Sequence, residues 1–411
     1  MKGKQIAAVC CSMGIFLSGC SAVKSPRDLI GSPRLENVQQ EEINYLLDQR
    51  ILSNAELLAP RYGLMNRSIF IEDVNGDGTK EGFVFYRAGQ KGYVLLLVLK
   101  EDPEGWKEVS TLDLGDRTLD YFELADLNGD GKKEVAVGLE TPDYAKEKEL
   151  LIYQYVSSGL KERVAQRYEG MDIADYDGDQ KPDVLLVTGK RREGFEANLF
   201  SFEKNQLKSR SSIELNGYAF HQKMEGGELN DGHRAFFADS KIGITSMLTE
   251  IIAYHKGRLV LAGKEQNNFS LIPSRDINHD GITEACRVYV PKGWEEADLS
   301  AVPYIESYQS FSSNGKTKKV EERYKDKAGR FYIIIPPEWY GRITVEKISS
   351  GIQLRSASNR ELLFEIKWAS KKSLDSAKNV IKETKDTIFY TEQNIKPKIP
   401  VGNFRLMESE F

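Results

Sequence analysis

The stretch Asp73-Val74-Asn75-Gly76-Asp77-Gly78-Thr79-Lys80-Glu81 decides how the rest of the chain is interpreted, because its pattern occurs four times. The other copies cover residues 126–134, 175–183 and 276–284. Side-chain oxygens stand at positions 1, 3, 5 and 9, and position 6 is glycine in three of the copies. A calcium ion takes about six to eight oxygen ligands, and the tight turn around it favours glycine. The pattern therefore predicts calcium-binding loops.

The neighbours of these loops indicate strands. An EF-hand starts with the same spacing but needs a glutamate at position 12, and position 12 here is Val84, Val137, Leu186 or Arg287. The flanking residues are instead short apolar or alternating runs, which are typical of β-strands. These runs are 68–71 and 83–86 at the first loop, 121–124 and 135–137 at the second, and 171–174 and 184–187 at the third. Each loop is predicted to connect a hairpin.

The spacing of the loops predicts the architecture. They start at residues 73, 126, 175 and 276, about 50 residues apart, and the last interval is about twice as long. Two more strand candidates, 93–100 and 106–114, make four strands per unit. We expect the long interval to hold a unit without a loop, with its remnant at 235–239 and 249–254 and Glu250 as the position 9 acid. Such units are typical of a β-propeller, here of about five blades over 41–320.

The Asp-x-Asn/Asp-x-Asp-Gly-x-x-Asp/Glu hairpins resemble the calcium loops of FG-GAP and VCBS-like repeats, found in integrin α-subunit-type propellers and in many secreted bacterial proteins. The Phe-Gly and Gly-Ala-Pro signatures of the FG-GAP repeat are absent. The resemblance implies ligands at positions 1, 3, 5 and 9, and a carbonyl ligand at position 7. These are Asp73, Asn75, Asp77, Thr79 and Glu81; Asp126, Asn128, Asp130, Lys132 and Glu134; Asp175, Asp177, Asp179, Lys181 and Asp183; and Asp276, Asn278, Asp280, Ile282 and Glu284. The calcium site of loop 3 is expected to be the weakest, because Gln180 replaces the glycine at position 6. The alternative to calcium binding is that the loops are acidic surface turns without an ion.

The N-terminus resembles that of a bacterial lipoprotein. Lys2 and Lys4 precede an apolar run over 6–17 that is too short to cross a bilayer as a helix. The run ends in Leu17-Ser18-Gly19-Cys20, which resembles a lipobox. This resemblance implies removal of residues 1–19 and a diacylglycerol anchor on Cys20, at the extracytoplasmic face of the bacterial cell membrane. A plain signal peptide is the alternative, and the polar residues 20–40 are predicted to be a tether.

The length and composition fit a folded, acidic protein of two or three domains, or of one repeat array with an appendage. The chain has 411 residues, with 57 Lys and Arg against 62 Asp and Glu, which gives a net charge of −5. Nucleic acid is not an expected partner, because a surface that follows phosphates needs a basic excess. Three of the four cysteines lie within the first 20 residues, so no disulfide framework is expected, and Cys286 is expected to be buried.

The composition changes after about residue 312. Residues 314–330 are almost all polar and charged and are predicted to form a linker or a solvated hairpin. Strands are predicted at 331–336, 342–348, 352–356, 361–369, 387–391 and 404–408, and a helix at 373–384 with Leu374, Ala377 and Ile381 on one face. Residues 321–411 are therefore expected to form a small α+β domain.

The sequence offers no legible catalytic motif. Gly315-Lys316-Thr317 lacks the first glycine of a P-loop, the four histidines form no ligand pair, and no Gly-x-Ser-x-Gly is present. We therefore expect a non-enzymatic module whose calcium-stiffened propeller binds a protein or glycan of the cell envelope. The alternative is a hydrolase or lyase of an envelope polymer, with its active site at the propeller mouth.

Overall fold

The computed structural model describes residues 37–50, 55–63, 67–88, 92–142, 147–373, 379–392 and 397–407. The predicted signal peptide, Cys20 and most of the predicted tether lie outside these residues. The chain divides into two units, Met1–Ile51 and Leu52–Phe411. The first contains helix α1 (Asn37–Arg50), which replaces the end of the predicted tether at residue 40 and the start of the predicted propeller at residue 41. Its lack of glycine and proline suits a helix. No helix in the described ranges is long and apolar enough to cross a membrane.

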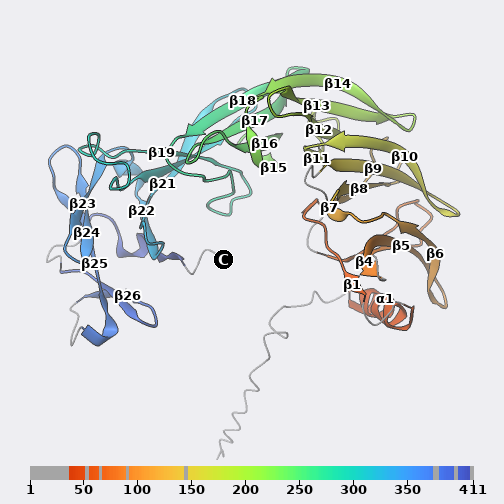
Figure 1. Cartoon of the computed structure of the whole chain (residues 1–411), viewed down its shortest axis with the longest axis horizontal. Helices are drawn as coiled ribbons and strands as arrows, with labels where there is room; N and C mark the ends of the chain where they lie inside the picture. Colours follow the sequence, from red (N-terminus) through yellow and green to blue (C-terminus); the bar gives the residue numbers. More distant parts are fainter. Residues whose placement is uncertain are drawn as a thin grey trace, which may run out of the picture. The chain divides into compact units, whose positions relative to one another are not determined.

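The second unit consists mainly of β-strands (Figure 1). Among the described residues, five successive sheets each contain four strands that follow one another in the chain. Sheet 1 holds β3 (Ile69–Glu72), β4 (Glu81–Ala88), β5 (Tyr93–Asp102) and β6 (Gly105–Asp113); sheet 2 holds β7 (Thr118–Ala125), β8 (Glu134–Glu140), β9 (Lys148–Val156) and β10 (Gly159–Tyr168); sheet 3 holds β11 (Gly170–Ala174), β12 (Asp183–Lys190), β13 (Gly194–Glu203) and β14 (Gln206–Leu215). Sheet 4 holds β15 (Phe220–Glu228), β16 (Arg234–Lys241), β17 (Met247–His255) and β18 (Arg258–Asn267), and sheet 5 holds β19 (Ala285–Tyr289), β20 (Ile305–Phe311), β21 (Thr317–Lys325) and β22 (Phe331–Ile335). The short strands β1 (Glu56–Leu57) and β2 (Tyr62–Gly63) pair with β4 and β7.

The predicted hairpins around the loops are confirmed. The first three loops connect β3 to β4, β7 to β8 and β11 to β12. The fourth loop leads into β19, and an antiparallel bridge between Arg275 and Glu284 closes it. Each repeat of the nine-residue pattern therefore forms the same kind of turn between antiparallel segments.

The unit without a loop is sheet 4, and the predicted position of its remnant is wrong. Residues 235–239 and 249–254 lie in β16 and β17, which pair with each other. The connection that corresponds to the loops is the one from β15 to β16, over residues 229–233. The first residue of β16 is Arg234, so an arginine and not Glu250 stands where the other sheets carry the position 9 acid. The prediction failed because an apolar sequence shows that a segment is a strand but does not show which neighbouring strand it pairs with across the missing loop.

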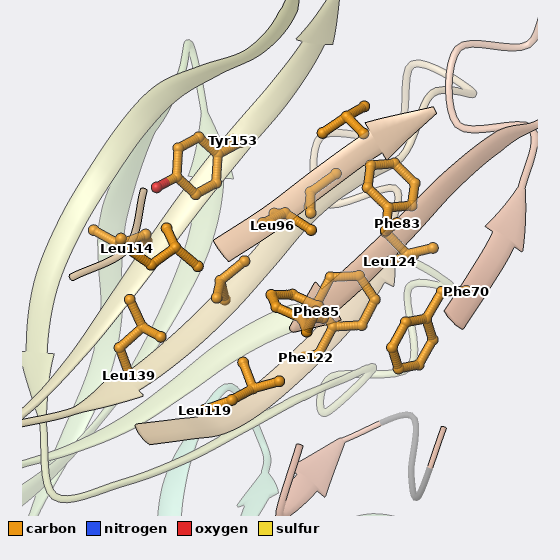
Figure 2. Packing of buried hydrophobic residues seen from close by; sticks show 14 of the residues in the cluster. Phe70, Phe83, Phe85, Leu96, Leu114, Leu119, Phe122, Leu124, Leu139 and Tyr153 are labelled. Atoms are coloured by element: carbon orange, nitrogen blue, oxygen red, sulfur yellow. The ribbon is translucent and has the colours of Figure 1, made fainter. Parts of the chain in front are cut away.

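Neighbouring sheets share apolar cores. Phe70, Phe83 and Phe85 of sheet 1 lie in one cluster with Phe122 of sheet 2 (Figure 2). The ring centroids of Phe70 and Phe122 are 4.3 Å apart, and those of Phe85 and Phe122 are 5.0 Å apart. Further clusters join sheets 2 and 3, sheets 3 and 4, and sheets 4 and 5. Each sheet thus buries its apolar residues against the next sheet in the chain.

The chain is therefore mainly β, with several sheets of four or five strands. Among the described residues the strand ladders lie within the sheets, the core clusters join each sheet to its neighbours in sequence, and none of these clusters joins sheet 1 to sheet 5. Closure of these sheets into a propeller is not seen and stays a proposal.

The predicted helix at 373–384 is wrong where the structure describes it. Residues Val380–Glu383 form strand β26, which pairs with β27 (Thr387–Tyr390), and residues 374–378 lie outside the described residues. The other strands of this sixth sheet are β23 (Ile343–Ile348), β24 (Gly351–Ser356) and β25 (Leu362–Ser370), and β28 (Phe404–Leu406) pairs with β22 of sheet 5. Within the described residues, short 3₁₀ helices cover Pro337–Trp339, Lys371–Ser373 and Val401–Asn403. The apolar spacing suits a helix, but pairing with β27 overrides it, so the described tail is β and not α+β.

The boundary predicted at 320/321 falls inside a strand. Strand β21 crosses this position and pairs with β20 before it and β22 after it, so the polar stretch is a hairpin and not a linker. One core cluster contains Phe331 of sheet 5, Phe389 of sheet 6 and Phe404 of β28. Because sheets 5 and 6 share this core, the structure does not separate the tail from the preceding sheets.

Candidate functional site

The four acidic loops share one network of hydrogen bonds to the backbone. The aspartate at position 1 accepts from the N–H of position 6, at 2.9 Å for Asp73, 2.8 Å for Asp126, 2.9 Å for Asp175 and 2.9 Å for Asp276. Position 3 accepts from the N–H of position 5, at 2.8 Å for Asn75, 2.8 Å for Asn128, 3.1 Å for Asp177 and 3.2 Å for Asn278. The aspartate at position 5 accepts from the N–H of position 7. These distances are 2.8 Å for Asp77, 2.9 Å for Asp130, 2.8 Å for Asp179 and 2.9 Å for Asp280. The sequence pattern thus encodes one backbone turn.

The position 9 residues are the most deeply buried acids of the loops. Glu81, Glu134, Asp183 and Glu284 are almost fully buried. Each accepts a hydrogen bond from the N–H of position 2, at 3.1, 3.0, 3.2 and 3.1 Å respectively. A buried carboxylate is costly unless hydrogen bonds or a cation balance it. These four residues are therefore the places where a bound cation would matter most.

Glu284 has a buried oxygen that lacks a partner. Its Oε2 atom accepts from Ile277 N–H, whereas Oε1 is buried and makes no hydrogen bond. Burial, together with the charges of Asp280 and Asp276, raises the pKa of Glu284 to about 7. A calcium ion bound to Oε1 would supply the missing partner and favour the ionised carboxylate. Among the described residues, only the loop 3 carboxylates converge within 4.8 Å, so what loop 4 offers a cation is the unpartnered Oε1 atom of Glu284.

Loop 3 brings three carboxylates together. The ligand oxygens of Asp175, Asp177 and Asp183 lie within 4.8 Å of one another, so this group could hold a metal ion. Gln180 adopts a φ of 69°, in the left-handed region that glycine accepts most easily. The expected weakness at position 6 thus does not prevent the turn.

Basic side chains reach the ligand sets of loops 1 and 3. Lys100 Nζ lies 2.7 Å from Asp77, and Arg210 Nη1 lies 2.5 Å from Asp177 and 3.3 Å from Asp183. In loop 2 the neutral amide of Gln154 donates to Glu134 at 3.1 Å. A cationic side chain competes with a metal ion for the same oxygens, so Lys100 and Arg210 would oppose a bound ion at loops 1 and 3. Strand spacing alone could not have revealed these neighbours.

In sheet 4 an arginine replaces the acid and its expected ion. Nε and Nη2 of Arg234 both lie 2.9 Å from the carboxylate of Asp172 in β11, and Nη1 lies 3.2 Å from Glu228. The hydroxyl of Tyr176 donates to the same Asp172 carboxylate at 2.9 Å. The guanidinium thus links sheets 3 and 4 with a fixed positive charge. A basic residue at the place of the position 9 acid is the sequence feature that could have revealed this contact. We did not recognise it because we assigned the wrong hairpin of sheet 4 to the missing loop.

We expect replacement of Glu123 by glutamine to flatten the pH dependence of stability between about pH 5 and 7. Burial and the Asp172 carboxylate raise the pKa of Glu123 to about 7. The folded chain then holds a proton that the unfolded chain releases near its ordinary pKa, so wild-type stability falls as the pH rises through this interval. The effect is at most about 1.4 kcal/mol per pH unit. Denaturant unfolding in chelator at several pH values measures it.

The control for this experiment is Glu104→Gln, which changes an exposed glutamate at the turn between β5 and β6. It should leave the pH slope of the wild type unchanged. Equal slopes for Glu123→Gln and the wild type would show that Glu123 ionises normally.

Comparisons with known proteins add little. No protein-family model matches the sequence, and no curated protein is similar enough to count as a relative. Among solved structures, a rhamnogalacturonan lyase PL11 of Bacillus licheniformis has a TM-score of 0.32 at 10% identity, with 74% of this chain and 69% of that chain covered. Sqt1 from Chaetomium thermophilum has 0.33 at 9% identity, covering 72% of each chain, and the exotype rhamnogalacturonan lyase YesX has 0.32 at 12% identity, covering 74% of this chain and 75% of that chain. TM-scores this low support no conclusion about fold or activity.

Proposed function

We propose that this chain is a non-enzymatic binding module of the bacterial cell envelope, built as a calcium-stabilised propeller of about five blades and anchored through a lipid on Cys20. Sheets 1 to 5 supply the blades, because each contains four consecutive strands and shares a core with the next sheet. The resemblance of the loops to those of FG-GAP and VCBS-like repeats supports the same architecture. The ligand is a protein or glycan of the envelope.

The buried Glu284 carboxylate is the observation that carries the calcium proposal. Its Oε1 atom has no hydrogen-bond partner, although Glu284 is 0% exposed. Asp276 and Asp280 stand at the other ligand positions of the same loop and provide further oxygens. An ion there would neutralise three carboxylates and give the unpartnered oxygen a ligand.

Calcium should raise the thermal midpoint of unfolding. A site with a Kd of about 10⁻⁴ M, as in extracellular modules, stabilises the folded state by about 2.7 kcal/mol at a hundredfold excess of calcium. For a unit that runs from Leu52 to Phe411, one site corresponds to about 3–4 °C. Scanning calorimetry in calcium and in chelator measures the difference, and calorimetric titration counts the ions.

The variant Glu284→Gln should bind about one calcium ion fewer and show a smaller midpoint difference. In chelator it should be at least as stable as the wild type, because it removes a buried charge. The matched control is Asp298→Asn, which changes an exposed acidic turn that accepts a hydrogen bond from Ser300 N–H at 2.7 Å but lacks the nine-residue pattern. Identical thermal midpoints in calcium and in chelator would contradict the calcium proposal and show that the loops are acidic turns without an ion.

A further inference from the structure

A cavity of about 650 Å³ lies at the ends of sheets 2, 3 and 4 that are opposite to the acidic loops. The loops follow the last residues of β7 and β11, whereas the cavity is lined by residues near the beginning of β7, β11 and β15. A second hollow of about 560 Å³ shares Lys148, Tyr168, Glu169 and Lys190 with it. The two together offer room for an elongated ligand.

The cavity wall contains a buried acceptor without a partner. Asp120 is 1% exposed, and its Oδ2 atom accepts from the Tyr168 hydroxyl at 2.7 Å and lies 3.0 Å from Lys148 Nζ. Its Oδ1 atom makes no hydrogen bond. Arg61 Nη1 is 3.9 Å from Oδ1, and it donates instead to Glu140 at 2.8 Å. A donor from a ligand would satisfy Oδ1.

A histidine in the same cavity has a nitrogen without a partner. Nδ1 of His221 lies 2.7 Å from the Ser240 hydroxyl, and the ring packs edge-on against Phe195. Its Nε2 atom is buried and has no hydrogen-bond partner. Burial lowers the pKa of His221 to about 4, so the ring is neutral near pH 7. A hydroxyl group, which both donates and accepts, can meet this nitrogen in either tautomer.

Aromatic side chains are exposed beside the cavity. Phe220, which lines it, is 54% exposed, and Tyr218, two residues earlier, is 74% exposed. Aromatic rings left open to water beside a cavity mark a binding surface, and their faces suit the flat apolar side of a sugar ring. Together with the two unpartnered polar atoms, they indicate a ligand that is rich in hydroxyl groups.

The turn between β12 and β13 brings positive charge to the same cavity. Lys190 and Arg191 line it and are exposed, and Arg191 Nε donates to the carbonyl of Tyr218 at 3.3 Å. Neither residue forms an ion pair within the described part of the chain. In a protein with a net charge of −5, two unpaired cations at a cavity favour an anionic group on the ligand.

We infer that this cavity binds an acidic oligosaccharide. Its hydroxyl groups would bond to Asp120 and His221, a sugar ring would stack on Phe220, and a carboxylate would lie at Lys190 and Arg191. This inference rests on the proposed role as a binding module, and it does not depend on the calcium sites.

The test is calorimetric titration of the purified protein in calcium with a glucuronate-containing tetrasaccharide. The comparison ligand is the same tetrasaccharide with its carboxylates reduced to alcohols, which removes the charge and keeps the hydroxyl groups. We expect the reduced form to bind about tenfold more weakly. The double variant Lys190→Gln/Arg191→Gln should bind the acidic form about tenfold more weakly and lose the preference for it.

Two further variants test the geometry. Phe220→Ala should weaken the binding of both ligands about five- to tenfold. Because Phe220 is 54% exposed, we expect the variant to fold as the wild type does. Arg192→Gln is the matched control, because Arg192 belongs to the same turn but does not line either hollow. It should change the Kd less than twofold.

Several outcomes would overturn the inference: no binding, equal affinity for the acidic and reduced ligands, or an equal effect of Arg192→Gln and the double variant. Binding that persists in chelator, in a protein that calcium does not stabilise, would support the cavity and contradict only the calcium proposal. Calcium stabilisation without saccharide binding would contradict only the cavity. Chromatography of the tetrasaccharide after incubation with the protein would show whether it is cleaved. Cleavage would support saccharide binding at the cavity but contradict a non-enzymatic role.

Discussion

Replacing Phe331 by alanine should lower the free energy of unfolding by about 3–5 kcal/mol. Phe331 is 0% exposed and lies at the centre of an aromatic cluster. Its ring centroid is 5.7 Å from that of Trp368, 5.6 Å from that of Phe389 and 5.0 Å from that of Phe404. Alanine would leave a cavity lined by residues of both sheet 5 and sheet 6. Both sheets should therefore lose stability together.

Denaturant unfolding measures this loss, followed in parallel by far-ultraviolet circular dichroism and by tryptophan fluorescence. Trp339 and Trp368 pack against the same core and report on the tail. The control is Leu299→Ala, at a residue that is 63% exposed, which should cost less than about 0.5 kcal/mol. A tail that unfolds in its own transition, with the remaining signal unaffected by Phe331→Ala, would instead restore the boundary predicted at 320/321.

Replacing Arg234 by methionine should destabilise the protein by a similar amount, about 3–5 kcal/mol. The variant keeps an apolar side chain of comparable length but removes the only cation that the described structure places on the Asp172 carboxylate. Asp172 is 6% exposed, so it would be left as a buried charge next to the half-buried Glu123. The cost arises from this unpaired carboxylate, because the ion pair itself gains little over an apolar pair.

Urea unfolding at pH 7 measures the effect of Arg234→Met, and Arg167→Met is the matched control. The Arg167 side chain is 71% exposed and pairs with Glu147 at the surface, so its loss should cost less than about 1 kcal/mol. The double variant Arg234→Met/Asp172→Leu should recover most of the stability, since no charge then stays buried. If the double variant is as unstable as Arg234→Met, the loss comes from packing and not from the charge.

Local features of this protein follow from the sequence alone. The nine-residue pattern predicts the four loops, because a turn depends on the φ preferences and short side chains of adjacent residues. Alternating apolar residues predict the flanking strands, and apart from β26 the strands of the tail lie within one or two residues of their predicted bounds. Cys286 is buried, as its place in an apolar strand indicates.

Features that join distant residues were decided by the tertiary structure. The spacing of residues 374, 377 and 381 suits a helix, but a partner strand turned 380–383 into β26. For the polar stretch 314–330 the sequence leaves a linker and a solvated hairpin open, and pairing of β21 with β20 and β22 decides for the hairpin. Sequence patterns report how a segment prefers to fold by itself, whereas pairing with a remote strand adds hydrogen bonds that the segment does not encode.

Of the candidate sites, the acidic loops can be predicted from the sequence, whereas the arginine contact and the cavity cannot. The loop carboxylates lie within nine residues of one another, so their grouping is visible in the sequence. The contact of Arg234 with Asp172 and the shared cavity of Asp120 and His221 depend on which sheets pack together. Such contacts arise because apolar faces of successive sheets exclude water as they stack, and this packing brings residues from separate units to one place.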